Sequence, residues 1–281
     1  MRAFTFKDLF LTVVFMLLGC LTIQAADDDL ITKQITIKLD KAGTLPNKIG
    51  SSEKYKITNL KLVGEINGTA WKMIREMAGS NYNGYSTEGK LSTLDLSEAK
   101  IVKGGDSYYS GDNCYTSNDE IGEYAFHDCS GLTSLTLPAG ITSISDYAFS
   151  RCSGLTSLNI PSSITKIGSY AFIYCSGLTS IYVYPDIVPK MGSDVFYDVD
   201  KKNCTLYVPQ GTKQDYFLAD VWGDFENIVE FDATGIDKTT TSTDAKEVSR
   251  YSVNGQRLSA PSKGLNIVKY SDGSVKKVAV E

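Results

Sequence analysis

The sequence predicts a β-rich α/β solenoid built from 23-residue units. Three observations predict it. The cysteines Cys129, Cys152 and Cys175 return at a fixed 23-residue step in the middle of the chain. Each unit holds a short stretch that alternates apolar and polar residues, as a half-buried strand does. In two units a proline ends that stretch, because proline cannot continue a ladder of backbone hydrogen bonds.

Seven columns of side chains follow the same step. They are Ala125, Ala148 and Ala171; Phe126, Phe149 and Phe172; Cys129, Cys152 and Cys175; Leu132, Leu155 and Leu178; Leu135, Leu158 and Ile181; Leu137, Ile160 and Val183; and Ile141, Ile164 and Ile187. A fixed period over three units is typical of a solenoid, and a period of this length with this leucine spacing lies in the leucine-rich-repeat range. No unit can bury its own leucines alone, so stacking of neighbouring units must stabilise the fold.

Each unit divides into a strand, a return leg and a turn. The strand is the stretch L-T-S-L-x-L, and Ile141 and Ile144 begin the return leg. The segment 146–152 is expected to form one or two helical turns with its alanine, phenylalanine and cysteine directed inward. Glycines close the corner into the next strand, where a tight turn favours a residue without Cβ. These glycines are Gly131, Gly154 and Gly177.

The repeat continues more weakly on both sides of these three units. Upstream, Leu91–Leu96 and Ile57–Leu62 copy the strand. Residues 69–78 are expected to form a helix capped by Thr69, with Trp71, Ile74 and Ala78 on one face. Downstream, Val195–Phe196 echoes the turn and Leu206–Pro209 echoes the strand. Residues 211–229 are expected to close the last coil as an atypical cap, which solenoids need at their ends. The covering side chains would be Tyr216, Phe217, Leu218 and Trp222.

The N-terminus has the pattern of an export signal. Arg2 and Lys7 precede an uncharged, mostly apolar run over 9–23, and Ala25 and Ala26 offer small residues for cleavage. This run is shorter than the roughly 20 residues that span a bilayer. Cys20 leaves a second interpretation open, in which it is lipidated and tethers the protein to a membrane.

Five cysteines remain after such cleavage, namely Cys114, Cys129, Cys152, Cys175 and Cys204. An odd number in an exported chain argues against a complete disulfide framework. We therefore expect the repeated cysteines to pack as small apolar side chains. One disulfide between neighbouring coils, such as Cys129–Cys152, stays open as an alternative.

Composition and motifs exclude several classes of function. The net charge is −5 and no basic run occurs, so the chain lacks the electrostatic signature of nucleic-acid binding. The only histidine is His127, for which a surface position is expected. No nucleophile elbow, paired-histidine metal motif or paired-cysteine motif is present. We expect a protein that is not an enzyme and that uses no cofactor and no metal.

Two features are candidates for binding. If the leucines point inward, one outward column along the strands contains Lys61, Asp95, Thr136, Asn159, Tyr182 and Tyr207, with Tyr184 nearby. A second outward column contains Asn59, Thr93, Ser134, Ser157, Ser180 and Thr205. Exposed tyrosines in a row suit contact with a protein or a sugar. The alternative is that these tyrosines only cover the last coils.

The second feature is a pair of insertions, 80–89 and 104–119, that break the period. They are rich in Tyr, Ser, Gly and Asn, the composition of recognition loops. Long loops on a rigid scaffold often carry function, although plain spacers have a similar composition. The residues to test there are Tyr108, Tyr109 and Tyr115.

The expected domain order is a signal peptide (1–25), an N-terminal cap with a first irregular repeat (26–90), the solenoid with its C-terminal cap (91–231), a polar linker (232–249) and a small β tail (250–281). In the tail, Asn254-Gly255 and Asp272-Gly273 are hairpin signals. A plain β tail and a sorting module both fit this pattern.

The frame A-F-x-x-C-S-G-L-T-S-L-x-L-P resembles the BspA-like branch of leucine-rich repeats, which occurs in surface and secreted proteins of Bacteroidetes and some protozoa. The tail resembles the C-terminal sorting module of type IX secretion. The resemblance implies a curved solenoid, and adhesion to host proteins as some members show. We therefore expect an exported recognition or adhesion scaffold for a surface protein or glycan. The alternative is a passive structural or envelope-assembly component with a sorting tail.

Overall fold

The computed structural model describes residues 29–111, 114–232, 247–252, 257–258, 260, 263–270 and 275–280. The expected signal peptide with Cys20 and residues 233–246 of the expected linker lie outside these ranges. So do the two expected hairpin turns of the tail.

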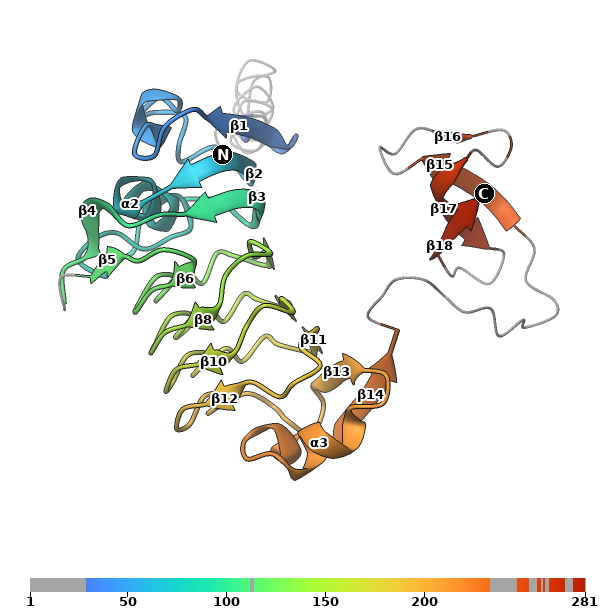
Figure 1. The fold of residues 1–281 in the computed structure, drawn as a ribbon. Helices are drawn as coiled ribbons and strands as arrows, with labels where there is room; N and C mark the ends of the chain where they lie inside the picture. Colours follow the sequence, from blue (N-terminus) through green and yellow to red (C-terminus); the bar gives the residue numbers. More distant parts are fainter. Residues whose placement is uncertain are drawn as a thin grey trace, which may run out of the picture.

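A parallel ladder of strands follows the solenoid from its first coil to its last (Figure 1). It consists of a sheet in the order β1-β2-β3-β7 followed by a sheet in the order β9-β11-β13-β14. The first four strands are β1 (Ile35–Leu39), β2 (Asn59–Ile66), β3 (Thr93–Ile101) and β7 (Ser134–Thr136). The next four are β9 (Ser157–Ile160), β11 (Ser180–Val183), β13 (Thr205–Pro209) and β14 (Asn227–Phe231). The two sheets meet where the Thr156 N–H donates to the Thr133 carbonyl.

A second, narrower ladder forms another side of the coils. Its strands are β6 (Glu120–Ile121), β8 (Ser143–Ile144), β10 (Lys166–Ile167) and β12 (Lys190–Met191). Paired residues are 23 apart from β6 to β10 and 24 apart from β10 to β12. This extra residue shifts the last coil by one place. The expectation that Ile187 points inward is therefore wrong: its side chain is 86% exposed, and Val188 packs against the core instead.

The third side of each coil is a run of turns and not the expected helical turn. Coils bond to one another here: the N–H groups of Phe126 and Phe149 donate to the carbonyls of Ala148 and Ala171 in the next coil. Two residues per coil have a left-handed backbone, in the columns that contain Tyr147 and Arg151. In a helix the backbone N–H groups would bond within the segment. The left-handed residues break that pattern and turn the N–H groups toward the carbonyls of the neighbouring coil.

The core between the three sides is a stack of repeated side chains. Phe126, Phe149 and Phe172 are fully buried, and successive ring centroids lie 5.0 Å apart in nearly parallel planes. The expected cysteine packing is confirmed: the repeated Cys129, Cys152 and Cys175 are fully buried and are not joined by disulfides. The Cys152 thiol donates to the Phe126 carbonyl at 3.0 Å, and burial raises the pKa of that thiol well above its ordinary value.

The corner glycines are required for a reason other than the expected one. A Cβ on Gly154 would lie 2.3 Å from the Ser130 carbonyl oxygen, and one on Gly177 the same distance from that of Ser153. Neither glycine has a left-handed backbone. The close approach of the previous coil therefore excludes a side chain at these corners.

The N-terminal coil is covered by η1 (Leu45–Asn47) and by the helix α2 (Gly68–Met77). Trp71, Ile74 and Ala78 are buried, as expected. The expected cap was wrong by two residues: Asn67 is the N-cap, and its side chain accepts from the Thr69 N–H at 3.2 Å. The hairpin of β4 (Gly104–Tyr109) and β5 (Cys114–Thr116) packs beside α2.

At the other end lie α3 (Lys213–Leu218) and η2 (Trp222–Asp224). Tyr216 and Trp222 are buried against the last coil, as expected. Phe217 and Leu218 are 55% and 70% exposed, so the expectation that they cover the coil is wrong. In this short helix they project outward and leave an apolar surface uncovered.

The tail forms an antiparallel sheet of its own, in the order β16-β15-β17-β18. Its strands are β15 (Glu247–Ser252), β16 (Arg257–Leu258), β17 (Gly264–Tyr270) and β18 (Val275–Val280). Inside it the buried Arg250 donates to Glu247 and to the Asn266 side chain. The expected β character of the tail is confirmed.

Candidate functional site

The register of the strands brings the predicted columns together on one face, here called the strand face. Lys61 pairs with Asp95, which pairs with Thr136. Further along, Asn159 pairs with Tyr182, and Tyr182 with Tyr207. The inward neighbours in these strands, such as Leu94 and Ile181, are fully buried. The first column therefore lies on the outward side, as the alternation in the sequence predicted.

An aromatic cluster occupies the C-terminal end of the strand face. It consists of Tyr182, Tyr184, Tyr207 and Phe231, all half-buried. The rings of Tyr182 and Tyr207 stack with centroids 4.3 Å apart and planes 5° apart. Phe231 stands edge-on to Tyr182 at 5.7 Å and to Tyr184 at 5.2 Å. Rings fixed in this way lose little rotational freedom when a partner binds them.

The electrostatics of the cluster favour neutral tyrosines. Burial, followed by the neighbouring Tyr207, raises the pKa of Tyr182 above its ordinary value. The hydroxyl therefore stays protonated at neutral pH and remains both a donor and an acceptor of hydrogen bonds. The cluster offers aromatic surface with a polar edge, the combination that is frequent in protein interfaces.

The N-terminal end of the same face is charged. The Lys61 Nζ lies 3.3 Å from Asp95 Oδ2 and 2.7 Å from Glu98 Oε1. Burial would raise the pKa of Asp95, but hydrogen bonds from Ser97 and the Lys61 ammonium outweigh it and lower that pKa. The predicted residue Asp95 thus belongs to an ion-pair network some coils away from the tyrosines.

The tyrosines predicted as a binding site in the insertions are not all exposed. Tyr108 is only 1% exposed, and its hydroxyl donates to the Glu123 carbonyl at 2.9 Å. Its ring lies 6.5 Å from that of Trp71. Tyr108 thus belongs to the core, and it cannot contact a ligand while the hairpin stays in place.

Tyr109 is half-buried and Tyr115 is 58% exposed. The Tyr109 ring stacks on Tyr124 at 4.9 Å, and the Arg75 guanidinium lies over it at 5.0 Å. The two insertions meet, since the Ser110 N–H donates to the Tyr82 carbonyl. Of the three predicted tyrosines here, only Tyr115 is well exposed.

His127 is not the surface residue that the sequence suggested. It is half-buried between the rings of Tyr109 and Tyr124, and its Nε2 lies 2.9 Å from Asp128 Oδ2. Burial lowers its pKa, the nearby Arg75 lowers it further, and Asp128 opposes both. Tyr109 of the second insertion covers His127, and the repeat period alone did not predict this contact.

The sequence interpretation also missed a row of stacked tyrosines on the turn side. The rings of Tyr124, Tyr147 and Tyr170 stack at 5.1 and 5.0 Å. Their 23-residue step was visible in the sequence, but nothing there shows that left-handed backbones align them. Phe231 was missed because it lies in the expected cap, outside the repeat columns.

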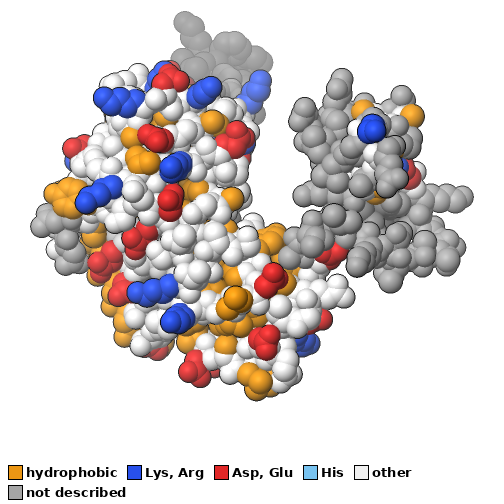
Figure 2. Space-filling model, in the orientation of Figure 1, with side chains coloured by type: hydrophobic (Ala, Val, Ile, Leu, Met, Phe, Trp, Pro, Cys, Tyr) orange, Lys and Arg blue, Asp and Glu red, His pale blue; other side chains and the backbone are white. Residues whose placement is uncertain are grey.

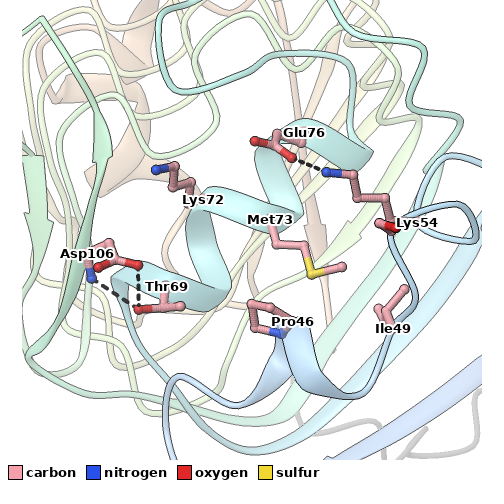
Figure 3. A pocket seen from close by; sticks show the side chains of 9 residues that line it. Pro46, Ile49, Lys54, Thr69, Lys72, Met73, Glu76 and Asp106 are labelled. Atoms are coloured by element: carbon pink, nitrogen blue, oxygen red, sulfur yellow. Dashed lines mark hydrogen bonds and ion pairs between the residues drawn. The ribbon is translucent and has the colours of Figure 1, made fainter.

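A pocket of about 230 Å³ lies between η1 and α2 (Figure 3). Its apolar floor is formed by Pro46, Ile49 and Met73. The ion pair of Lys54 and Glu76, at 2.5 Å, borders one side. Lys54 and Glu76 are thus paired with each other, and the Lys72 Nζ lies over the Tyr82 ring at 4.8 Å.

A second pair of polar side chains, Thr69 and Asp106, also borders this pocket. Asp106 accepts a hydrogen bond from the Thr69 hydroxyl at 3.1 Å, beside the start of α2. The Asn67 side chain caps the helix there, so neither of these polar groups needs a ligand as a partner. We therefore place the candidate site on the strand face and not in this pocket.

Comparison with known families bears on the coils that carry this site. Residues 113–214 match the family model described as BspA type Leucine rich repeat region (6 copies). This part of the chain consists of BspA-type leucine-rich repeats. No curated protein matches the chain. The leucine-rich repeats fit a scaffold that binds proteins, and Tyr182, Tyr184 and Tyr207 all lie within the matched repeats.

No helix in the described part of the chain is both long and apolar enough to cross a bilayer. Within the same ranges, no cluster of three or more His, Cys, Asp or Glu side chains is arranged to hold a metal ion.

Proposed function

We propose that the chain is an exported binding scaffold at a bacterial cell surface, of the kind found in Bacteroidetes, and that it recognises a protein partner through the strand face. The observation that carries the proposal is the aromatic cluster of Tyr182, Tyr184, Tyr207 and Phe231. It combines half-exposed rings with fixed geometry on a rigid scaffold. Aromatic side chains that become buried when a partner binds carry a large share of the free energy in protein interfaces.

The proposal has no catalytic step. The strand face presents threonines, asparagine, tyrosines and one ion-pair network, and none of these makes a nucleophile paired with a base. A glycan ligand is the second possibility at the same cluster, because tyrosines also contact sugars. The binding experiment below separates the two.

The test measures binding of the purified chain to a panel of extracellular matrix proteins, mucins and neutral glycans. For any ligand bound, Tyr182→Ala with Tyr207→Ala is expected to weaken the affinity at least about tenfold, as loss of hot-spot residues does. The matched control is Tyr174→Ala with Tyr197→Ala, an exposed pair on the turn side whose rings lie 5.8 Å apart. Equal affinity for the strand-face variant and the parent would refute the site.

Export is tested separately. Mass spectrometry of the protein recovered outside the cell is expected to find an N-terminus at residue 26 or 27. Cleavage before Cys20 with an added lipid mass would show the tethered form instead. A Cys20→Ser variant then distinguishes the two forms, because only the tethered form would leave the membrane fraction when this cysteine is replaced.

The tail supports a second role, in sorting or envelope assembly. Its described strands form a separate antiparallel sheet with its own buried Arg250–Asn266 pair, bonded at 3.2 Å. Deletion of 247–281 is expected to leave the fold of the repeats intact and to retain the protein inside the cell. Unchanged secretion of the shortened chain would exclude a sorting role for the tail.

A further inference from the structure

Among the described strands, β1 and β14 are the outermost strands of the parallel ladder. Within the described ranges, no strand pairs with the outer side of β1, and none pairs with the outer side of β14. Both belong to ladders in which every neighbouring pair is parallel. An edge strand presents unpaired N–H and C=O groups and can accept a strand from another chain.

Apolar side chains at both edges are only partly covered. In β1, Ile35 and Ile37 are half-buried, whereas their partners in β2, Leu60 and Leu62, are fully buried. At the other end Val229 of β14 is 43% exposed, beside the exposed Phe217. A hollow of about 570 Å³ lies there between β14 and α3, with Phe217, Phe225 and Ile228 in its lining. It is large enough to take side chains from an added strand.

The charges of the two ends are opposite. Residues 27–56, which follow the expected cleavage site, contain six lysines and five carboxylates, a net charge of +1. Residues 213–232 contain one lysine and six carboxylates, a net charge of −5. Figure 2 shows blue and red side chains interspersed around the N-terminal end and mostly red ones over the α3 end. Opposite charge on two patches steers them toward each other and disfavours pairing of like ends.

We propose that these two ends are an interface between copies of this chain, which associate head to tail. The β1 edge of one copy adds in parallel to the β14 edge of the next. Ile35 and Ile37 then lie on the same side of the joined sheet as Ile228 and approach the hollow beside α3. Lys33 and Lys38 approach the carboxylates around β14, where Glu226 makes no ion pair with a described residue.

This interface is heterologous, because each copy uses a different surface toward each of its two neighbours. Association of that kind does not close at a dimer unless a ring forms, and it extends with concentration. Each added copy would bring another strand face and aromatic cluster. The assembly would therefore bind repetitive ligands with an effective concentration that a single copy lacks.

The test is sedimentation velocity of the chain recovered after export, over a range of concentrations at low and at high salt. The average mass is expected to rise with concentration without stopping at a dimer, and to fall as salt screens the ends. A head variant, Lys33→Glu with Lys38→Glu, and a tail variant, Glu226→Lys with Val229→Lys, are each expected to weaken association at least about tenfold. The control Lys166→Glu with Lys190→Glu changes two exposed lysines of the second ladder and is expected to have no effect.

One further sample separates head-to-tail association from other modes. An equimolar mixture of the head variant with the tail variant keeps one intact interface, so it should stop at a dimer. A monomer at every concentration, a parent that stops at a dimer, or a mixture that stays monomeric would each overturn the proposal. Circular dichroism melts confirm that each variant is folded.

Discussion

Two pairs of tyrosines in this chain lie in different environments, one on the strand face and one in an insertion. Tyr182 and Tyr207 lie on the strand face, stacked on each other and half-exposed. Tyr108 and Tyr109 lie in the insertion, where Tyr108 is buried and Tyr109 stacks on Tyr124. The first pair remains available to a partner, and the second pair attaches the hairpin to the coils.

The difference teaches how position in a solenoid decides what a residue does. A residue within the repeat inherits its orientation from the ladder, so alternation along the strand predicts which side it faces. A residue within an insertion has no such constraint, and a large aromatic ring there gains free energy by burial. Loop composition alone therefore overstated the insertion as a recognition surface.

The largest effect that would test this comparison is the loss of Tyr108. Tyr108→Ala is expected to lower the free energy of unfolding by about 3–5 kcal/mol, because it removes a buried ring and leaves a cavity. Tyr108→Phe keeps the ring and loses the bond to Glu123, a cost of about 1 kcal/mol. Urea unfolding measures both, with Tyr115→Ala in the same hairpin as a control near zero. A Tyr108→Ala chain as stable as the parent would show that the hairpin is not anchored.

A smaller effect is expected on the strand face. Tyr182 and Tyr207 should couple by about 0.5–1.5 kcal/mol, the range for aromatic pairs beyond the area they bury. A double-mutant cycle of the two alanine variants, followed by urea unfolding, measures this coupling. No coupling would mean that the rings are not held by each other, and the argument for a preformed cluster would then fail.

The sequence predicted the ladders well and the remaining geometry less well. The columns of Phe149 and Cys152 are buried as expected, because period and polarity fix them. The turn side was not predictable, since Tyr147 and Arg151 adopt left-handed backbones that such residues rarely take. One extra residue before β12 moved Ile187 outward. Small changes in spacing carry no signal in composition, yet they decide which side chain faces the core.

The same limit holds for the candidate site. Tyr182, Tyr184 and Tyr207 were predictable because strand alternation places them. Phe231 was not, because it comes from the closing strand and joins the cluster only through the stacking of coils. The sequence therefore predicted the strand face but not Phe231, whose ring stands edge-on to those of Tyr182 and Tyr184.

The pH dependence of the free energy of unfolding also tests how the insertion is attached to the coils. The folded-state pKa of His127 is lowered, by burial first and by Arg75 and Arg151 after it, against the attraction of Asp128. Below its ordinary pKa of about 6.5, the unfolded chain gains a proton that the folded chain resists. Stability is therefore expected to fall as pH drops from about 6.5 toward the lowered value.

Urea midpoints measured from pH 8 to pH 5 follow this change. His127→Gln removes the titrating group and is expected to flatten the profile in that range, while Tyr109 and Tyr124 keep their stacking. A profile of the same steepness in this variant would assign the pH dependence to carboxylates elsewhere and leave the packing of His127 without energetic consequence.

The smallest effect is expected at the charged end of the strand face. Hydrogen bonds from Ser97 and Lys61 hold the pKa of Asp95 below its ordinary value despite burial. A carboxyl with a lowered folded-state pKa stabilises the fold above its unfolded pKa, and this contribution is lost as the pH falls through the lowered value. Asp95→Asn should therefore change stability slightly at pH 7 and not at all in strong acid, and added salt should reduce the difference. Because this network lies some coils from Tyr207, the same variant should leave binding at the aromatic cluster unchanged. A weaker affinity would instead extend the binding surface along the whole strand face.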